Sequence, residues 1–250
     1  INNDVTCKDE LVLRLREMLE DYRRRRGDRS IGRADVVRSG LKALDQTLPR
    51  GGLPVGAVTE ILCGAAGVGV MTLALGMARR AANGSRTVVV IDARDDFYPP
   101  AAARLGIPVE RLLVIRSRRT ADAVWAMDQS LRCPAVGAVI AWLDRLRPGE
   151  SRRLQLAAEA GGTIGLVIRP RLVRERTFAA VRIALEPVPV DESTVRGNRV
   201  RPVRISVLKV REGMPVEPFL VGLDDEEGFV SLPSVAVAGS SRAGGRRIGA

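Results

Sequence analysis

The sequence contains no histidine, and only 3% of its 250 residues are aromatic. Without histidine, the chain cannot form a His-based catalytic triad, a His–metal site or an imidazole pH switch. Its three cysteines, Cys7, Cys63 and Cys133, show no C-x-x-C spacing, which predicts reduced thiols rather than a zinc site. No apolar run reaches the roughly 18 residues of a membrane span. These absences predict a cytoplasmic protein that holds no metal and makes no membrane contact.

Positive charge, by contrast, is abundant. Lys and Arg number 40 against 29 Asp and Glu, which gives a net charge of +11. Two interpretations stay open: a basic but merely solvated surface, as arginine-rich coding in a high-GC genome produces, or a surface that attracts nucleic acid or an acidic partner. Hydrophobic residues make up 46% of the chain, which suits one globular domain with an aliphatic core and flanking tails.

The middle of the chain alternates strand-like and helix-like segments, which predicts βαβ units and an α/β fold with a mostly parallel central sheet flanked by helices. Two further segments, 180–188 and 200–211, alternate apolar and charged residues and predict a closing antiparallel pair. In the second, Val203, Ile205 and Val207 share one face. The predicted strands of the parallel part are 57–62, 87–92, 112–116, 136–142 and 163–169, and the predicted helices are 71–83, 98–105, 119–132 and 149–160.

The two ends of the chain differ from this core. Residues 8–26 carry one apolar stripe at i, i+3, i+4 spacing, which predicts an amphipathic helix that must cover some surface, its own or a neighbour's. The final Gly/Ser/Arg-rich stretch predicts a disordered basic tail. We therefore divide the chain into 1–35, 36–232 and 233–250. The apolar stripe consists of Leu11, Val12, Leu15, Met18, Leu19 and Tyr22.

A glycine-rich loop follows the strand predicted at 57–62 and precedes an apolar helix, which is the context of a phosphate-binding loop. Gly64 and Gly69 fit the start of the pattern G-x-x-x-x-G-K-[ST], but Val70 replaces the lysine and Met71 replaces the hydroxyl residue. The two glycines are also explained by a tight strand-to-helix turn, and the helix start retains a weak affinity for anions. The sequence therefore has the strand, glycine-rich loop and helix of an ATPase, but it lacks the lysine and the hydroxyl residue that act on the nucleotide.

The order of these landmarks resembles the RecA core, through 38–45 before the loop and 51–61 leading into it. A closer resemblance is to the ImuA family, RecA-like accessory proteins encoded with bacterial translesion-synthesis genes. That resemblance is carried by 97–103, 111–116, 137–143 and 153–162. It implies a RecA-like core with an N-terminal docking arm.

Carried over residue by residue, the RecA resemblance fails at the ATP site. It implies that the catalytic glutamate falls on Arg94 of Asp92-Ala93-Arg94 and the magnesium-binding aspartate on Trp142. The remaining replaced positions are Val70, Met71, Ala101 (adenine stacking) and Pro170 (γ-phosphate sensor). Phosphoryl transfer needs a metal, charge neutralisation and a positioned base. We therefore expect no catalytic residue, no cofactor and no metal.

RecA's two DNA-binding loops correspond to 143–150 and about 171–177, and both are too short to form equivalent loops. Cations nevertheless gather at the second, which makes them candidate DNA contacts, although a solvated face is the more common explanation of such a run. We expect DNA binding to be weak or indirect. These cations are Arg169, Arg171, Arg174 and Arg176.

Lys209 and Arg211 resemble the Lys-x-Lys pair with which RecA reaches the ATP of its neighbour. The alternative is a surface pair on an edge strand. Together with the apolar stripe of 8–26, in particular Leu11, Leu15, Met18, Leu19 and Tyr22, they are the candidate RecA contacts. A subunit with one functional face would cap a RecA filament, because head-to-tail growth needs two faces.

The resemblance implies a non-catalytic accessory protein of SOS-associated translesion synthesis and mutagenesis. Its expected partners are RecA and an ImuB-type Y-family-like polymerase subunit, with an error-prone DnaE-type polymerase as a further candidate. Two alternatives stay open: an active DNA-binding RecA-like ATPase, and a SulA-like inhibitor of cell division. ATP turnover would support the first alternative, and binding to the tubulin-like division protein would support the second.

Overall fold

The computed structural model describes residues 14, 36–65, 67–173, 175–189, 200–211, 216–224 and 228–230. Its centre is a nine-stranded sheet in the order β11-β10-β9-β8-β3-β7-β6-β4-β5. The strands are β1 (Val36–Val37), β2 (Leu53–Pro54), β3 (Val58–Cys63), β4 (Thr87–Asp92), β5 (Leu112–Arg116), β6 (Val136–Trp142), β7 (Ile164–Pro170), β8 (Val181–Pro187), β9 (Val200–Val210), β10 (Phe219–Asp224) and β11 (Gly228–Val230). The helices are α2 (Lys42–Thr47), α3 (Val70–Ala82), α4 (Pro99–Arg104), α5 (Thr120–Arg132) and α6 (Pro148–Gly161), with short 3₁₀ turns at Pro49–Gly51 and Val109–Arg111.

The six strands from β8 to β5 run parallel, and β9, β10 and β11 follow in antiparallel order. The inner parallel strands β3, β4, β6 and β7 are rich in Val, Ile, Leu and Ala and are buried on both faces, as expected where helices cover a sheet on both sides. The predicted α/β fold with a mostly parallel sheet is confirmed, and so is the antiparallel pairing of 180–188 with 200–211.

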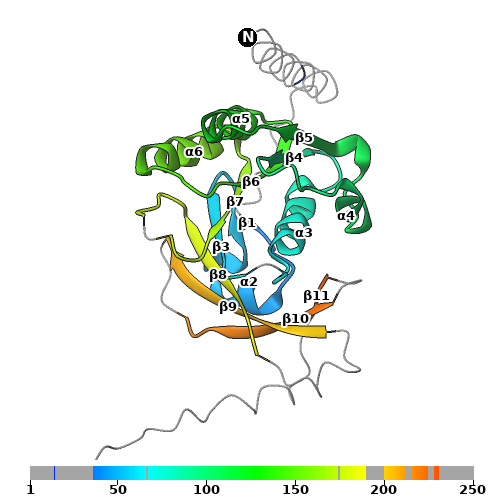
Figure 1. Ribbon diagram of the computed structural model, residues 1–250, viewed down its shortest axis with the longest axis vertical. Helices are drawn as coiled ribbons and strands as arrows, with labels where there is room; N and C mark the ends of the chain where they lie inside the picture. The colour runs from blue at the N-terminus through cyan, green and yellow to red at the C-terminus, as the bar shows by residue number, and fades with distance from the viewer. Residues whose placement is uncertain are drawn as a thin grey trace, which may run out of the picture.

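Helices cover the two faces of the sheet in separate layers (Figure 1). One face packs on α2, α3 and α4 in a cluster that contains Leu44, Leu73 and Ala102. The other face packs on α5 and α6 around Met127 and Leu154. Each helix buries one apolar stripe, which is the usual reason for an amphipathic helix to lie on a sheet.

The helix ends carry residues whose conformation or charge favours the start or end of a helix. α3 begins after Gly69, which has a left-handed φ of 73°, and ends at Asn83, whose N–H donates to the carbonyl of Arg79. α6 begins with Pro148, and the Glu150 carboxylate accepts the N–H of Arg147 at 2.7 Å. Proline and an acidic residue in the first turn both favour a helix start. The loop before α3 and the N-terminal end of α6 therefore have fixed positions at the carboxyl ends of the strands.

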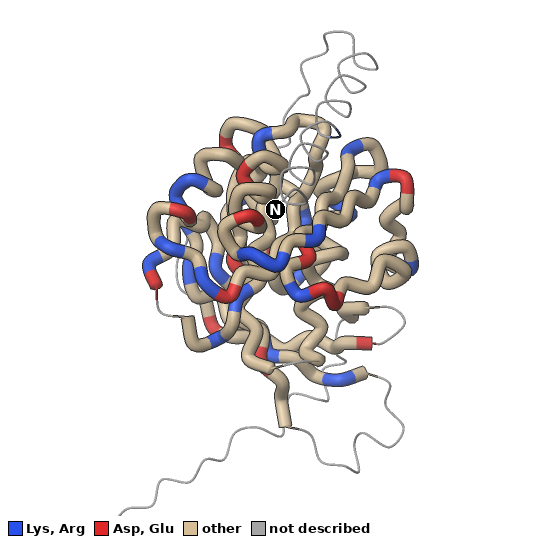
Figure 2. Tube along the Cα trace, turned by 45° about the horizontal axis from the view of Figure 1, so that its top comes forward, with Lys and Arg blue, Asp and Glu red and all other residues tan. Residues whose placement is uncertain are grey.

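The described helices include none that is long and apolar enough to cross a membrane. The predicted amphipathic helix at 8–26 and the tail at 233–250 lie outside the described residues, apart from Arg14. Basic and acidic residues are interspersed along the described chain (Figure 2).

Candidate functional site

The glycine-rich loop lies between the carboxyl end of β3 and the start of α3, as predicted. Val70 is buried, and Met71 packs against the core cluster below α3. The two positions at which a phosphate-binding loop needs a lysine and a hydroxyl therefore carry apolar side chains that are engaged in packing. Neither can neutralise phosphate charge or hold a magnesium ion.

The hairpin of β10 and β11 covers the start of α3. A Cβ atom placed on Gly69 would lie 2.7 Å from both Cδ atoms of Leu223 and 3.2 Å from Cε2 of Phe229. Gly69 is therefore required for two reasons, its positive φ and the close approach of these side chains. Phe219 and Phe229 both pack against the core cluster, so this hairpin is attached to the core.

A cavity of about 260 Å³ remains beside the loop. Arg201 reaches over it and donates from Nη1 to the carbonyl oxygen of Gly67 at 3.4 Å. Ala101, at the position expected for the adenine-stacking aromatic, offers only a methyl group to the cavity wall. The residues that line it are Gly67, Gly69, Thr72, Ala101, Arg104, Leu105, Arg201, Leu223, Asp224 and Gly228.

Arg94, Trp142 and Asp144 form a compact cluster at the carboxyl ends of β4 and β6. Arg94 Nη2 donates to Asp144 Oδ1 at 2.7 Å, and the guanidinium carbon lies 3.9 Å from the centre of the Trp142 ring. The indole Nε1 of Trp142 donates to the same carboxylate oxygen at 3.1 Å. A guanidinium stays protonated in proteins, so Arg94 cannot act as a general base. Its charge is instead paired with Asp144.

Cys63, the last residue of β3, lies close to this cluster. Its thiol donates to the carbonyl oxygen of Ala65 at 2.9 Å. Burial raises the pKa of the Cys63 thiol above its ordinary value of 9.0, although the nearby Arg94 acts in the opposite direction. The thiol is therefore protonated near neutral pH and is not an activated nucleophile.

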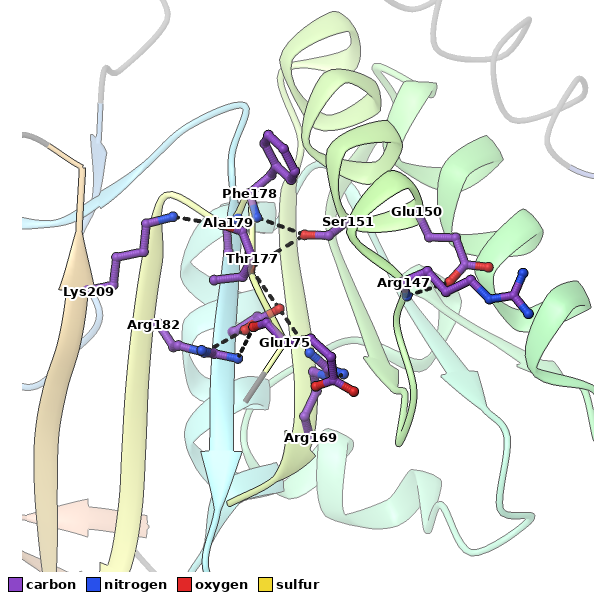
Figure 3. A network of polar contacts seen from close by, with 11 residues as sticks. Arg147, Glu150, Ser151, Arg169, Glu175, Thr177, Phe178, Ala179, Arg182 and Lys209 are labelled. Carbon is purple, nitrogen blue, oxygen red and sulfur yellow. Dashed lines mark hydrogen bonds and ion pairs between the residues drawn. The ribbon is translucent and has the colours of Figure 1, made fainter. Parts of the chain in front are cut away.

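A buried ion network lies beneath the connection between β7 and β8 (Figure 3). Its centre is Glu60, a fully buried residue in the middle of β3. Arg169 Nη1 lies 3.5 Å from Glu60 Oε1, and Arg182 Nε lies 2.8 Å from Glu60 Oε2, an ion pair whose N–H is not aligned for a hydrogen bond. Thr177 Oγ1 donates to Glu60 Oε1 at 2.8 Å. One buried carboxylate is thus paired with cations from both neighbouring strands.

The same network fixes the connection from 171 to 180. Glu175 pairs with Arg169 at 3.3 Å, and Phe178 N donates to Ser151 Oγ of α6 at 2.9 Å. Lys209 Nζ donates to the carbonyl oxygen of Thr177 at 2.9 Å. The connection is therefore tied to β3, β7, β9 and α6, as the sticks in Figure 3 show. These contacts attach residues 175–180 to the sheet and to α6.

The prediction that four arginines present their charges together at this edge is wrong for Arg169. Its side chain is 1% exposed and is paired with Glu60 and Glu175, so it cannot reach a phosphate. Arg171 Nε is paired with Glu186 at 2.9 Å, and Arg176 is exposed. Arg174 lies outside the described residues. The physical reason is the buried Glu60, which needs a compensating cation from the neighbouring strand.

Lys209 and Arg211 lie at the opposite end of the sheet from the glycine-rich loop. Lys209 is aligned with Arg182 near the start of β8, whereas Gly64 N donates to the Leu185 carbonyl near its end. β10 pairs with β9 only from Val200 to Ile205, so Lys209 and Arg211 lie beyond the described neighbour of β9 on that side, and both are exposed. This position fits the alternative of a surface pair on an edge strand. Burial lowers the pKa of Lys209, with a smaller contribution from the charge of Arg211. Arg211 Nη1 lies 3.7 Å from Glu159 Oε1.

Other predicted site residues lie outside the described part of the chain. These are Leu11, Leu15, Met18, Leu19 and Tyr22. Within the described ranges, no group of three Cys, Asp and Glu side chains is placed to hold a metal ion.

Sequence reasoning missed Glu60 and Arg182 as partners. The available signal was a charged residue inside each of two otherwise apolar strands, Val-Thr-Glu-Ile-Leu and Val-Arg-Ile-Ala-Leu. Opposite charges that interrupt buried strands favour a pairing between those strands, since a buried charge is rarely tolerated alone.

The family model described as the RecA N-terminal domain matches residues 22–146. The protein ImuA of Caulobacter vibrioides (strain NA1000 / CB15N) is similar over 202 residues, at 31% identity, which covers 72% of this chain and 80% of that protein. The protein RecA of Chlorobaculum tepidum is similar over 113 residues at 33% identity, covering 45% of this chain and 32% of that protein.

A shorter match is to the cell division inhibitor SulA of Edwardsiella piscicida, at 38% identity over 66 residues, covering 26% of this chain and 39% of that protein. Among solved structures, the crystal structure of the RadB recombinase superposes with a TM-score of 0.61 at 15% identity, covering 79% of this chain and all of that one. This structural likeness establishes the fold as RecA/RadB-like.

Proposed function

Since the chain belongs to the ImuA family of RecA-like proteins, we propose that it is a non-catalytic accessory protein of SOS-associated translesion DNA synthesis and mutagenesis. Its partners in this proposal are RecA and an ImuB-type Y-family-like polymerase subunit, with an error-prone DnaE-type polymerase as a further candidate. The protein would act in the cytoplasm through these contacts and not by turning over a nucleotide.

The observation that carries the non-catalytic part is the apolar cover over the start of α3. Val70 is buried there, and Leu223 and Phe229 pack onto Gly69. A polyphosphate would have to displace these side chains without the lysine and magnesium that neutralise its charge. Arg94, paired with Asp144, supplies a cation where a carboxylate base is needed. These features support a pseudo-ATPase.

The proposed RecA contact uses the end of the sheet at which β3 and β8 begin, where Lys209 and Arg211 lie, together with the apolar stripe of 8–26. A subunit with a usable face here and a closed nucleotide site at the other end would join a filament once and stop its growth, because head-to-tail polymers need two complementary faces. We therefore propose that the protein caps RecA filaments and inhibits recombination.

Direct DNA binding has a smaller part in this proposal. The connection from 171 to 180 is tied down by Glu60, Ser151 and Lys209, and Arg169 is paired inside the protein. Arg171 and Arg176 are left as candidate phosphate contacts. Weak or indirect binding to DNA fits this arrangement better than wrapping of a strand.

The alternatives are less well supported. A RecA-like ATPase would need chemistry at Val70, Met71 and Arg94 that these side chains do not offer. A SulA-like division inhibitor rests on a match to 26% of the chain. The match leaves about three quarters of the chain without an assigned role.

Binding to purified RecA tests the proposal. We expect the wild-type chain to bind RecA, and the variant Lys209→Glu/Arg211→Glu to bind at least tenfold more weakly, since two cations become anions. The control is Arg118→Glu/Arg145→Glu, an equal charge change at two exposed arginines, with thermal melting as the check on folding. Unchanged binding of the first variant would remove this edge from the proposal, and no binding of the wild type would remove RecA.

A further inference from the structure

A second cavity, of about 350 Å³, lies along α3 beyond the glycine-rich loop. It shares Thr72, Arg104, Leu105 and Gly228 with the smaller cavity at the loop, so the two are continuous. Its walls come from the segment before α2, from α3, from the end of α4 and from β11. The lining residues are Ser39, Gly40, Leu41, Thr72, Leu73, Gly76, Arg79, Arg80, Arg104, Leu105, Gly106, Gly228 and Phe229.

Among the described residues, three arginines and no carboxylate line this cavity. Arg79 and Arg80 are exposed on α3, and neither is paired with an acidic side chain within the described residues. Arg80 Nη1 donates only to the carbonyl oxygen of Gly76, at 3.3 Å. Asp224, which lines the smaller cavity, does not line this one. Arg79 lies beside Gly106 and Arg80 beside Gly40, so the two guanidinium groups lie at different walls of one cavity. Guanidinium groups that have no described counter-charge favour the binding of an anion.

Glycines provide the space around these arginines. A Cβ atom on Gly40 would lie 2.5 Å from Arg80 Cζ, and one on Gly106 would lie 3.3 Å from Arg79 Nη1. Both glycines also have positive φ, 95° and 80°. Any other residue at these two positions would be strained and would crowd the guanidinium groups.

Gly76 gives the cavity its floor. It lies inside α3, where glycine weakens a helix relative to alanine, and no atom lies within 4 Å of the Cβ position. Packing therefore does not require glycine here, but a side chain would project into open space along the cavity. The remaining wall is apolar and includes Leu41, Leu73 and Phe229.

We propose that this cavity, the arginine pocket, binds a nucleoside phosphate, with the phosphate on Arg79 and Arg80 and the flat base against the apolar wall. Guanidinium groups bind phosphate oxygens in a bidentate manner. The cavity volume falls within the usual range for small ligands, and its mixture of apolar wall and few charged groups is typical of such sites. The ligand is a free nucleotide or the 5′-phosphorylated end of a DNA strand.

The arginine pocket adjoins the cavity at the glycine-rich loop, but none of the described loop residues lines it. Its occupation does not depend on the proposed binding to RecA. The experiment therefore uses the full chain alone. The probes are dTMP, inorganic phosphate, and an oligothymidylate with a 5′-phosphate and a 3′-fluorophore, with the same strand lacking the phosphate for comparison. Binding is measured by fluorescence anisotropy for the strands and by calorimetry for the small ligands.

Two variants separate the pocket from general surface charge. Arg79→Gln/Arg80→Gln removes the anion contacts and should weaken binding at least tenfold, since hydrogen bonds to a charged group are being lost. Gly76→Leu fills the floor while leaving every charge in place, and it should weaken binding to a similar extent. The charge-matched control Arg118→Gln/Arg145→Gln should bind within about twofold of the wild type. Thermal melting confirms that each variant is folded.

The outcomes are distinct. Loss of binding in both pocket variants supports the proposal. In that case, binding of dTMP assigns a free nucleotide, whereas a requirement for the 5′-phosphorylated strand assigns a DNA end. If Gly76→Leu binds like the wild type, or if all double variants lose binding equally, the anions are held by surface charge and the proposal is wrong. No measurable binding of any probe by the wild type also overturns it.

Discussion

Val70 and Met71, in the first turn of α3, show how single side chains decide what the glycine-rich loop can do. A phosphate-binding loop leaves the first turn of its helix open toward the ligand. Here Val70 is buried, and the adjacent Gly69 contacts Leu223 and Phe229. The loop has retained its backbone shape because the turn from β3 to α3 needs positive φ at Gly67 and Gly69. The shape is a requirement of the fold, and it does not indicate nucleotide binding.

Restoring the loop pattern should not restore catalysis. The variant Val70→Lys/Met71→Thr should show no DNA-stimulated ATP hydrolysis above background, because the base, the metal ligand and an open approach are still missing. It should also be less stable by about 1–3 kcal/mol, since a charged group replaces a buried apolar one. Phosphate release and thermal melting measure the two effects. Hydrolysis at a rate comparable with that of RecA under the same conditions would contradict this account.

Glu60 is the residue on which the ion network depends. Glu60→Gln removes the buried counter-charge of Arg182 and leaves Arg169 paired only with Glu175, so we expect a loss of about 3–5 kcal/mol in the free energy of unfolding. Glu110→Gln, at an exposed position, is the matched control and should change stability by less than about 0.5 kcal/mol. Urea denaturation followed by circular dichroism measures both. Equal effects of the two substitutions would show that the network contributes little.

The protonation of the Cys63 thiol should make both stability and thiol reactivity depend on pH. Its pKa in the folded protein is raised above 9.0 by burial, so the thiol keeps its proton where an unfolded thiol has lost it. The contribution of the protonated Cys63 thiol to the free energy of unfolding is therefore complete below pH 9.0. It is lost as the pH rises through the pKa of this thiol in the folded protein. In a Cys7→Ser variant, the rate of Cys63 alkylation by iodoacetamide should rise with a midpoint above 9.0. A midpoint below 9.0 would mean that Arg94 dominates over burial.

At the scale of elements, α6 carries two glycines with opposite expected effects. A Cβ atom on Gly161 would lie 2.0 Å from the carbonyl oxygen of Leu131 at the end of α5, whereas nothing lies within 4 Å of the corresponding position on Gly149. Gly161→Ala should therefore destabilise the protein by about 1–3 kcal/mol through overpacking. Gly149→Ala should stabilise it by up to about 1 kcal/mol, because alanine favours the helix. Thermal or urea unfolding of both variants is the measurement. Destabilisation by both, or by neither, would contradict the close approach of α5 and α6.

Several elements were predictable from local patterns. The ranges 87–92, 112–116 and 136–142 coincide with β4, β5 and β6, because runs of Val, Ile and Ala bounded by turn residues define buried strands. The helix predicted at 119–132 differs from α5 by one residue. Such local signals do not give the order of strands across the sheet. The position of β3 between β7 and β8 follows from contacts that are distant in the sequence.

The candidate site was predicted less completely, for the same reason. The failed loop pattern at Val70 and Met71 and the replacement at Arg94 could be seen residue by residue. The burial of Arg169 could not, because it depends on Glu60, more than a hundred residues earlier in the chain. The cover of the loop by Leu223 and Phe229 is likewise a contact between distant segments.

At the scale of the whole molecule, the two ends of the parallel strands have different properties. The carboxyl ends of the parallel strands carry the closed loop and the cluster of Arg94, Trp142 and Asp144. The connection from 171 to 180 leads from this end to the start of β8, where Thr177 accepts a hydrogen bond from Lys209. The opposite end carries Lys209 and Arg211, near the starts of β3 and β8. The proposed capping of a RecA filament requires such an asymmetry, because a capping subunit offers only one usable face to a neighbour.

The most direct test of this central claim is the DNA-dependent ATPase of RecA, measured together with filament formation by electron microscopy while the chain is titrated in. We predict inhibition and shortened filaments at well below one chain per RecA molecule, with Lys209→Glu/Arg211→Glu requiring a higher concentration for the same effect. Inhibition that appears only near equimolar amounts would indicate sequestration of RecA monomers or competition for DNA instead of capping. Unchanged RecA activity and filament length at every ratio would contradict the claim.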